Sequence, residues 1–267
     1  MSETVTPAIL LRRRPYGDAD LIVTALTADQ GKRAFLARSA RRSVRRFAGC
    51  LDPFSLLRIV AGRGKGALDE LREATLDRAF PALRTDPYRM ALASLWTEMV
   101  DGWLEPVVPQ PPLFDLFRTA LDHLEAERIP AERVHLIFQL RFLNLAGLAP
   151  DLFHCRECGL ALEGGALFAD IPSGGFRCAR CGDSAGRESP LPSGLLPRLR
   201  KTARPKSQGP PSDASADAPA ARLLERFIAH HLGRTPRSLA FLRNLRKADR
   251  GPESSTERQL SHAGSSA

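Results

Sequence analysis

The chain has 267 residues, an apolar fraction of 43% and a formal net charge of +9. This length and this apolar content favour a globular protein of two or three small domains, each able to bury apolar side chains. The first residues are polar and acidic, and no apolar run approaches about 20 residues, the length of a membrane helix. We therefore expect a cytoplasmic protein without membrane association.

The positive charge is concentrated at both ends of the sequence, in residues 1–80 and 191–267, whereas residues 81–190 are acidic in balance. Excess positive charge attracts polyanions, and a phosphate backbone is the usual one. A solvated basic surface explains the same composition. Charge alone leaves both interpretations open.

Residues 1–80 predict β structure. Short apolar runs are separated by Gly and Pro turn signals, and no helical period is present. About five strands in a segment of this length are typical of a small closed or nearly closed barrel. The clearest runs are Ala8–Leu11, Leu21–Leu26, Ala34–Ala37 and Phe54–Val60.

Residues 81–153 predict an α-helical domain. Apolar residues recur every three or four positions in three successive segments, around Leu92, Leu121 and Phe138, and the third segment ends at Gly147. An amphipathic helix must bury such a stripe, so we expect these residues to form a core rather than to bind a cofactor.

Residues 154–190 contain a cysteine pattern, C-x2-C-x19-C-x2-C, with a glycine, Gly159 or Gly182, after each pair. Two such turns complete a tetrahedron around zinc, and the glycines are expected in the left-handed conformation. Disulfides are disfavoured in the reducing cytosol, and four cysteines leave no open position for a catalytic water. Replacement of one sulfur by His154 stays open. The pattern predicts one structural Zn²⁺, with ligands Cys155, Cys158, Cys178 and Cys181.

Residues 191–246 predict two C-terminal helices, the first ending at Gly233 and the second beginning near Pro236. Residues 202–219 lack large apolar side chains and predict a flexible polar insert. We expect residues 247–267 to form a disordered tail.

No catalytic motif accompanies these elements. The glycine-rich stretch 62–66 lacks the spacing and the hydroxyl residue of a P-loop, and neither HExxH nor a deaminase-type H-x-E occurs. Cys50 is expected to be a small buried apolar residue rather than a nucleophile. The sequence predicts a protein that is not an enzyme.

A dense run of arginines directly follows the third predicted strand. Such a run in a barrel loop can follow a phosphate backbone. Strand alternation places Arg33 and Phe35 on one face of the preceding strand. An aromatic ring between cations can stack on a base. Phe47, Tyr16 and Phe54 are further candidate rings, with core packing as the alternative. A second basic cluster, Arg198–Lys206, is either a DNA contact or a solubilising stretch. The predicted DNA-binding residues are Arg33, Phe35, Arg38, Arg41, Arg42, Arg45 and Arg46.

Several of these segments resemble, in order and spacing, the bacterial recombination mediator family RecO. The resemblance covers about residues 5–246. Its motifs are Arg14–Asp20, Thr27 with Gly31-Lys32, Arg38 with Arg41-Arg42, Arg46-Phe47, Leu51–Phe54, Leu71–Ala74, Phe142–Leu152 before Cys155, His231–Arg234 and Ser238–Leu242.

The resemblance implies an α+β multidomain protein in which an N-terminal OB-fold β-barrel precedes a helical domain with an inserted four-cysteine zinc segment. It also implies that the protein binds single- and double-stranded DNA and anneals complementary strands. The protein would help to load RecA onto strands coated by single-strand-binding protein, with RecR as its partner. The implied location is the nucleoid. The rival hypotheses are a zinc enzyme and a zinc-ribbon RNA-binding or transcription-associated module.

Overall fold

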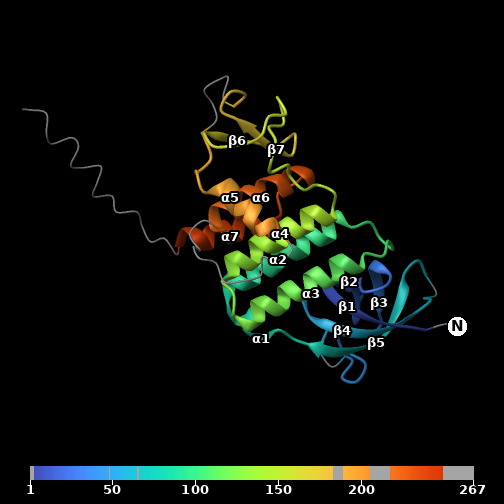
Figure 1. Ribbon diagram of the computed structural model, residues 1–267. Coiled ribbons are helices and arrows are strands. Elements are labelled where there is room, and N and C mark those ends of the chain that lie inside the picture. The colour runs from blue at the N-terminus through green and yellow to red at the C-terminus, as the bar shows by residue number, and fades with distance from the viewer. Residues whose placement is uncertain (1–2, 48, 65, 183–188, 205–216, 249–267) are drawn as a thin grey trace, which may run out of the picture.

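The computed structural model describes residues 3–47, 49–64, 66–182, 189–204 and 217–248. Its N-terminal part is a closed barrel in which the strand order is β1-β2-β3-β5-β4 (Figure 1). This Greek-key order confirms the expected OB-fold. The strands are β1 (Thr4–Tyr16), β2 (Asp20–Thr27), β3 (Gly31–Ala37), β4 (Leu56–Gly62) and β5 (Asp69–Arg78).

Strand β1 extends well beyond its apolar run. Its second half is polar and exposed, yet it pairs with β2 from Arg12 to Tyr16 after a register shift between Leu10 and Arg12. The shift bends the strand, as a β-bulge does. The three consecutive arginines 12–14 therefore lie on the part of β1 that extends into the β1–β2 hairpin.

The helical domain follows the barrel directly. Helix α2 begins after Asp86, whose side chain accepts hydrogen bonds from the backbone N–H groups of Tyr88 and Arg89 and so caps the helix. The predicted apolar stripes are confirmed as core: Leu92, Leu121 and Phe138 are all buried. The helices are α1 (Pro81–Thr85), α2 (Pro87–Trp103), α3 (Pro111–Ala126), α4 (Ala131–Leu145), α5 (Leu195–Ala203), α6 (Asp217–His231) and α7 (Arg237–Ala248).

The polar insert is shorter than predicted at both ends. Helix α5 continues to Ala203 and α6 begins at Asp217, because the Asp217 carboxylate is buried against the Arg198 guanidinium, 2.5 Å from Asp217 Oδ1 to Arg198 Nε. Residues 205–216 lie outside the described part of the chain. So do residues 249–267 of the predicted tail, whereas Lys247 and Ala248 belong to α7.

A small two-stranded sheet, β6 (Leu167–Asp170) and β7 (Gly175–Cys178), lies at the end of the helical domain opposite the barrel (Figure 1). One continuous apolar core runs through the helices and reaches Cys155, Leu162 and Phe176 of this segment. The helices thus lie between the barrel, which carries the predicted DNA-binding residues, and the cysteine segment, which carries the predicted metal ligands. Among the described residues, no helix is long and apolar enough to cross a membrane.

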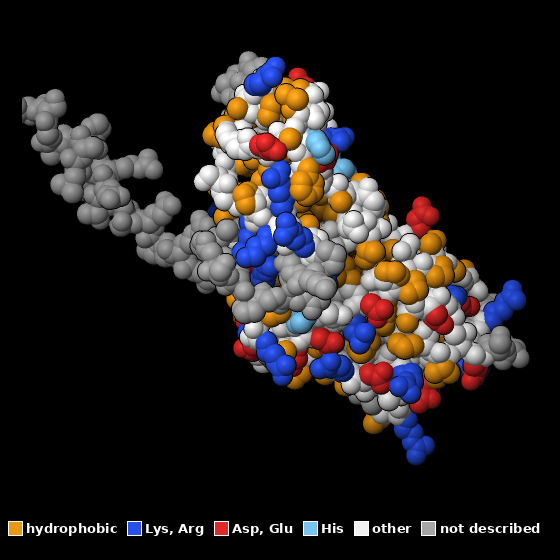
Figure 2. Space-filling model, in the orientation of Figure 1, with side chains coloured by type: hydrophobic (Ala, Val, Ile, Leu, Met, Phe, Trp, Pro, Cys, Tyr) orange, Lys and Arg blue, Asp and Glu red, His pale blue; other side chains and the backbone are white. Residues whose placement is uncertain are grey.

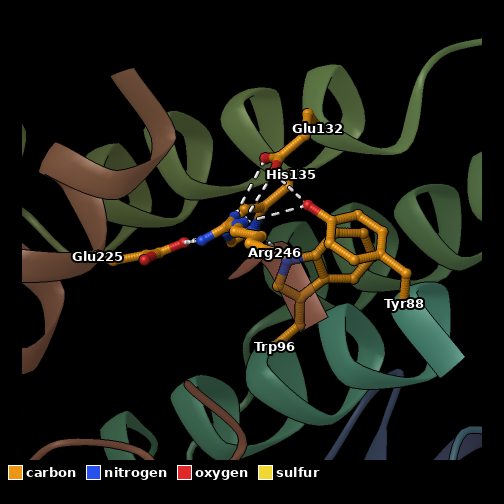
Figure 3. Close-up of polar contacts among 6 residues, drawn as sticks. All are labelled: Tyr88, Trp96, Glu132, His135, Glu225 and Arg246. Atoms are coloured by element: carbon orange, nitrogen blue, oxygen red, sulfur yellow. Dashed lines mark hydrogen bonds and ion pairs between the residues drawn. The ribbon is translucent and has the colours of Figure 1, made fainter. Parts of the chain in front are cut away.

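Polar groups are buried at the centre of the helical domain (Figure 3). Trp96 Nε1 donates to Nδ1 of His135, at 2.9 Å, so that ring nitrogen carries no proton. The proton of the neutral imidazole then lies on Nε2, which donates to Glu225 Oε1 at 3.2 Å. Both ring nitrogens of His135 therefore have hydrogen-bond partners inside the core.

Arg246 of α7 completes this network (Figure 3). Its guanidinium donates to Glu225 Oε1 at 2.7 Å and to Glu132 Oε1 at 2.9 Å, and the Tyr88 hydroxyl also donates to Glu132. Burial raises the pKa of Tyr88, and the nearby Glu132 carboxylate raises it further. These bonds tie α2, α4, α6 and α7 together, and satisfied buried polar groups favour a single packing arrangement.

Candidate metal centre and nucleic-acid surface

The four cysteines converge from two turns. Cys155 and Cys158 lie in the turn that precedes the small sheet, Cys178 ends β7, and Cys181 follows in the next turn. A parallel bridge between Cys155 and Phe176, with Arg156 N donating to Phe176 O at 2.9 Å, joins the first turn to β7. All four Sγ atoms lie within 4.8 Å of one another.

The spacing of the sulfur atoms suits tetrahedral coordination. A tetrahedron with metal–sulfur bonds of about 2.3 Å has edges of about 3.8 Å. The Sγ atoms of Cys158 and Cys178 are 3.8 Å apart, and Cys178 N donates to Cys155 Sγ at 3.4 Å. His154 does not join the group, since its ring Nδ1 lies 3.4 Å from the Asp151 carboxylate. The four cysteines can therefore bind one metal ion without His154.

The thiols of this group differ in acidity. Burial opposes ionisation of Cys155, but the backbone N–H groups of Cys158, Cys178 and Glu157 outweigh it and lower the pKa of Cys155 to about 6. A hydrogen bond with Cys158 and, as a smaller cause, burial raise the pKa of Cys181 to about 12. Four thiolates at this spacing need a cation, because their negative charges repel one another.

The two glycines after the cysteine pairs have different roles. Gly159 has φ of +71°, as expected, and its N–H donates to Cys155 O at 2.9 Å. The expectation for Gly182 is wrong, because its φ is not positive. A Cβ atom at Gly182 would lie 2.0 Å from the Phe168 ring, so close packing excludes a side chain there.

The predicted arginine run lies in the segment between β3 and β4, at the surface of the barrel. Arg38, Arg41, Arg42 and Arg45 are exposed, whereas Arg46 is half-buried, with its guanidinium 5.1 Å from the centre of the Phe47 ring. The side chains of Arg42 and Arg45 form no hydrogen bond or ion pair with residues that the structure describes. These two guanidiniums are free to bind an anion.

Backbone contacts hold this segment against the β1–β2 turn. Arg41 N donates to Ala19 O at 3.0 Å, and Arg41 Nη1 donates to Asp18 O at 3.1 Å. A groove of about 480 Å³ opens between the two segments. It is lined by Arg13, Pro15, Leu21, Ala40, Arg41, Phe47, Gly49 and Leu51.

The arginines of β1 were not among the predicted binding residues, whereas Tyr16 of the same strand was a candidate ring. Arg13 lines the groove, and its guanidinium is held by Asp52 Oδ1 at 2.8 Å and Leu51 O at 2.9 Å. Arg14 and Tyr16 are exposed on the same hairpin. Three consecutive arginines, 12–14, were the available signal in the sequence, but only the tertiary structure shows that Arg13 lines the groove, whereas Arg12 pairs with Asp101.

The expected stacking roles of Phe35 and Phe47 are corrected by their burial. Phe35 is 2% exposed and Phe47 is 1% exposed, and both pack inside the barrel, while Phe54 is buried between barrel and helices. Arg33 covers the Phe35 ring at 5.8 Å and pairs with Asp69. Tyr16, 54% exposed, has an aromatic ring that a base can reach.

The second basic cluster is divided between inward-facing and exposed side chains. Arg198 is buried in its ion pair with Asp217, and Arg200 donates to Leu152 O at 2.8 Å and to Leu162 O at 3.0 Å. Arg200 thereby attaches the cysteine segment to α5. Lys201 and Arg204 are exposed, and Lys206 lies outside the described residues.

Cys50, the remaining cysteine, is confirmed as a buried residue of the barrel core. Its Sγ donates to Ala74 O at 3.3 Å, and burial raises the pKa of its thiol. A buried thiol held in the protonated form is a poor nucleophile.

Comparison with known proteins covers both halves of the chain. Residues 1–80 match the family description "Recombination protein O N terminal", and residues 84–240 match "Recombination protein O C terminal". The chain belongs to the RecO family. The two matches extend from the barrel to the start of α7, in the order in which the structure has these elements.

RecO proteins of several bacteria are similar over nearly their whole length. "DNA repair protein RecO" of Desulfatibacillum aliphaticivorans is 40% identical over 92% of this chain and 99% of its own. The protein of the same name from Desulfosudis oleivorans is 34% identical over 90% and 97%, and that from Myxococcus xanthus is 36% identical over 88% and 95%. The chain is a RecO-family DNA repair protein, and the alternative of a zinc-ribbon RNA-binding module is not favoured.

Proposed function

We propose that this RecO-family chain is a recombination mediator that binds single- and double-stranded DNA and anneals complementary strands. The observation that carries the proposal is the arginine segment between β3 and β4, which presents exposed guanidiniums beside a groove on an OB-fold barrel. Backbone phosphates are the matching ligand, because such contacts need charge and reach but no base-specific geometry.

Arg38, Arg41, Arg42 and Arg45 are the proposed phosphate contacts. Arg33 and Arg46 have secondary roles, since Arg33 pairs with Asp69 and Arg46 Nη2 donates to Arg38 O at 2.6 Å. We assign base stacking to Tyr16 in place of Phe35. Arg13 and Arg14 extend the same surface along β1.

We propose that the metal is a structural Zn²⁺. Four cysteine sulfurs in a tetrahedral arrangement are the ligand set that zinc prefers, and a closed shell leaves no position for a catalytic water. Elemental analysis of protein purified without chelator should give one zinc per chain. Replacing Cys178 by Ser should lower the free energy of unfolding more than the DNA affinity of the folded fraction, because zinc binding contributes to folding.

The proposed partners are RecR, single-strand-binding protein and, indirectly, RecA, with a cytoplasmic, nucleoid-associated location. We also propose that the chain is not an enzyme. This rests on the absence of a P-loop from the sequence and on the closed cysteine set. ATP or GTP turnover that co-purifies with the protein through successive columns would contradict it.

A strand-annealing assay tests the main proposal. Two complementary oligonucleotides, one carrying a fluorophore and the other a quencher, are mixed with and without the purified protein. We expect faster quenching with the protein, and binding measured in parallel on DNA and on RNA of the same sequence should favour or match DNA. No acceleration, together with tighter binding to RNA, would instead support an RNA-binding function.

A further inference from the structure

The C-terminal helices carry a basic surface that the proposed barrel site does not include. No acidic residue occurs in the sequence from residue 226 to residue 248. On the face drawn in Figure 2, Lys and Arg side chains gather where Figure 1 places α5, α6 and α7, whereas side chains of both signs intermix over the barrel. Helix α7 ends this acid-free stretch.

The outward face of α7 combines cations with an aromatic ring. Ser238, Leu239 and Leu242 are buried against the helical domain. On the opposite side, Arg237, Phe241, Arg243 and Lys247 are exposed, and the Phe241 side chain is 51% exposed. The exposed Phe241 ring between basic residues gives this face an aromatic platform beside its cations, the combination that single-strand binding uses.

Helical geometry arranges these side chains in two rows. Positions 237 and 241 are four residues apart, as are 243 and 247, so each pair occupies one side of the exposed face. The small side chain of Ala240 and the amide of Asn244 lie between the rows and are also exposed. From residue 237 to residue 247 the helix rises about 15 Å, a length that covers a few nucleotides of an extended strand.

The cations of this face are not engaged elsewhere. Arg237, Arg243 and Lys247 form no ion pair with the residues that the structure describes. On the barrel, by contrast, Arg13, Arg33 and Arg38 are paired with carboxylates. A phosphate that binds at α7 therefore displaces no ion pair, whereas one that binds at those barrel residues must compete with Asp or Glu.

We infer that the exposed face of α7 is a second binding surface for the phosphate backbone of single-stranded DNA, with Phe241 stacking on an unpaired base. Cationic side chains beside a sequence-tolerant aromatic platform are what such binding requires. The inference rests on the proposed DNA-binding function. Figure 1 shows helices of the 81–145 region between α7 and the barrel, so the two surfaces can hold two separate strands.

The test replaces Arg243 and Lys247 by Gln in the full chain. A matched control, Arg118→Gln with Arg128→Gln, removes the same charge from the middle of α3 and from the segment that follows this helix. Binding to an oligothymidine of about ten nucleotides, within the usual range of single-strand sites, is measured as a function of salt. The α7 variant should lose about 1.4 from the slope of log K against log salt, about 0.7 for each lost phosphate contact, and the control should keep its slope.

The outcomes separate this inference from the proposed function. No binding of the wild-type chain to single strands would defeat the proposed function itself. Wild-type binding combined with equal slopes for the α7 variant and the control would defeat only the α7 surface. If the α7 variant instead lost affinity for a poly-glutamate peptide and kept its DNA affinity, the surface would be a docking site for an acidic protein, and the inference would be overturned.

Phe241 supplies an independent readout. Phe241→Ala should weaken binding to single strands several-fold, whereas its affinity for duplex should not change, because paired bases offer no free face. Phe241→Leu keeps an apolar side chain without a ring. It should behave like the Ala variant if stacking is the interaction, and equal affinities of wild type and both variants would contradict the stacking role.

Discussion

Two arginine-rich segments of this chain have opposite roles. Residues 38–46 and residues 198–204 have a similar density of cations, yet the first presents most of its guanidiniums to solvent and the second buries Arg198 and uses Arg200 to hold the cysteine segment. The difference comes from secondary structure. A segment between strands can direct successive side chains outward, whereas a helix packed on a core must turn part of every cationic run inward.

The largest expected effect comes from the inward-facing arginine. Arg198→Met leaves the buried Asp217 carboxylate without its shortest ion pair, and we expect a loss of about 4 kcal/mol in the free energy of unfolding. Lys201→Met, on the exposed side of the same helix, should change it by less than about 0.5 kcal/mol. Urea unfolding measures both. Equal effects would mean that the contrast between the two arginine segments is not one of burial.

Arg246 is a further arginine that faces inward and pairs with carboxylates. Arg246→Met should lower the free energy of unfolding at neutral pH by about 3 kcal/mol, because Glu225 and Glu132 lose their cation. The effect should also depend on pH. Burial opposes ionisation of Glu225, but its hydrogen bond with His135 and the positive charge of Arg246 keep its pKa below the ordinary value of 4.5.

The lowered pKa of Glu225 determines how the free energy of unfolding changes with pH. The ionised Glu225 stabilises the fold above pH about 4.5, and that contribution is lost as the pH falls through the lower folded-state pKa. Without Arg246 the folded-state pKa of Glu225 rises and its difference from the unfolded-state pKa shrinks, so the variant should lose less stability than the wild type as the pH falls below about 4.5. Unfolding free energies measured from pH 7 to pH 3 test this. Parallel curves for wild type and variant would show that Arg246 does not act on Glu225.

The outward-facing segment should behave in the reverse way. Replacing Arg41, Arg42, Arg45 and Arg46 by Ala removes three of the proposed phosphate contacts and should reduce the salt slope of DNA binding by about 2 on single strands and about 3 on duplex, about equally for any sequence. The free energy of unfolding should change by only about 1 kcal/mol, mainly through the contact of Arg46 with Phe47. An unchanged slope in a folded variant would transfer the DNA site away from the barrel, and α7 would be the next candidate.

The smallest expected effect concerns Tyr16, the exposed ring beside the arginine segment. Tyr16→Ala should weaken single-strand binding by about 1 kcal/mol, roughly fivefold, through the loss of stacking. Tyr16→Phe keeps the ring and should bind like the wild type. If both substitutions weaken binding equally, the hydroxyl rather than the ring makes the contact.

Local patterns in the sequence were sufficient for the barrel, for the helical core and for the cysteine group. The alternation and turn signals of residues 1–80 predicted the barrel, and the helical periods predicted the core residues Leu92, Leu121 and Phe138. The cysteine spacing predicted the metal group, because each pair lies within one tight turn. Spacing of this kind is local, so it does not depend on how distant segments pack.

Roles that depend on distant partners were predicted less well. Alternation correctly placed Arg33, Phe35 and Ala37 on one side of β3, but it could not say which side the closed barrel encloses, and Phe35 proved to be inside. Gly182 was expected to serve a backbone conformation, whereas the ring of Phe168 excludes a side chain at that position.

The sequence by itself therefore determined the barrel, the helical core, the cysteine group and the two basic ends, since composition and short-range periodicity encode these features. Only the tertiary structure decided which arginines remain available to an anion. Arg198 meets Asp217 across 19 positions of sequence, and Arg246 meets Glu132 across 114. A guanidinium is neutralised by whichever carboxylate the packing brings to it, and packing between distant segments is not written in any local pattern.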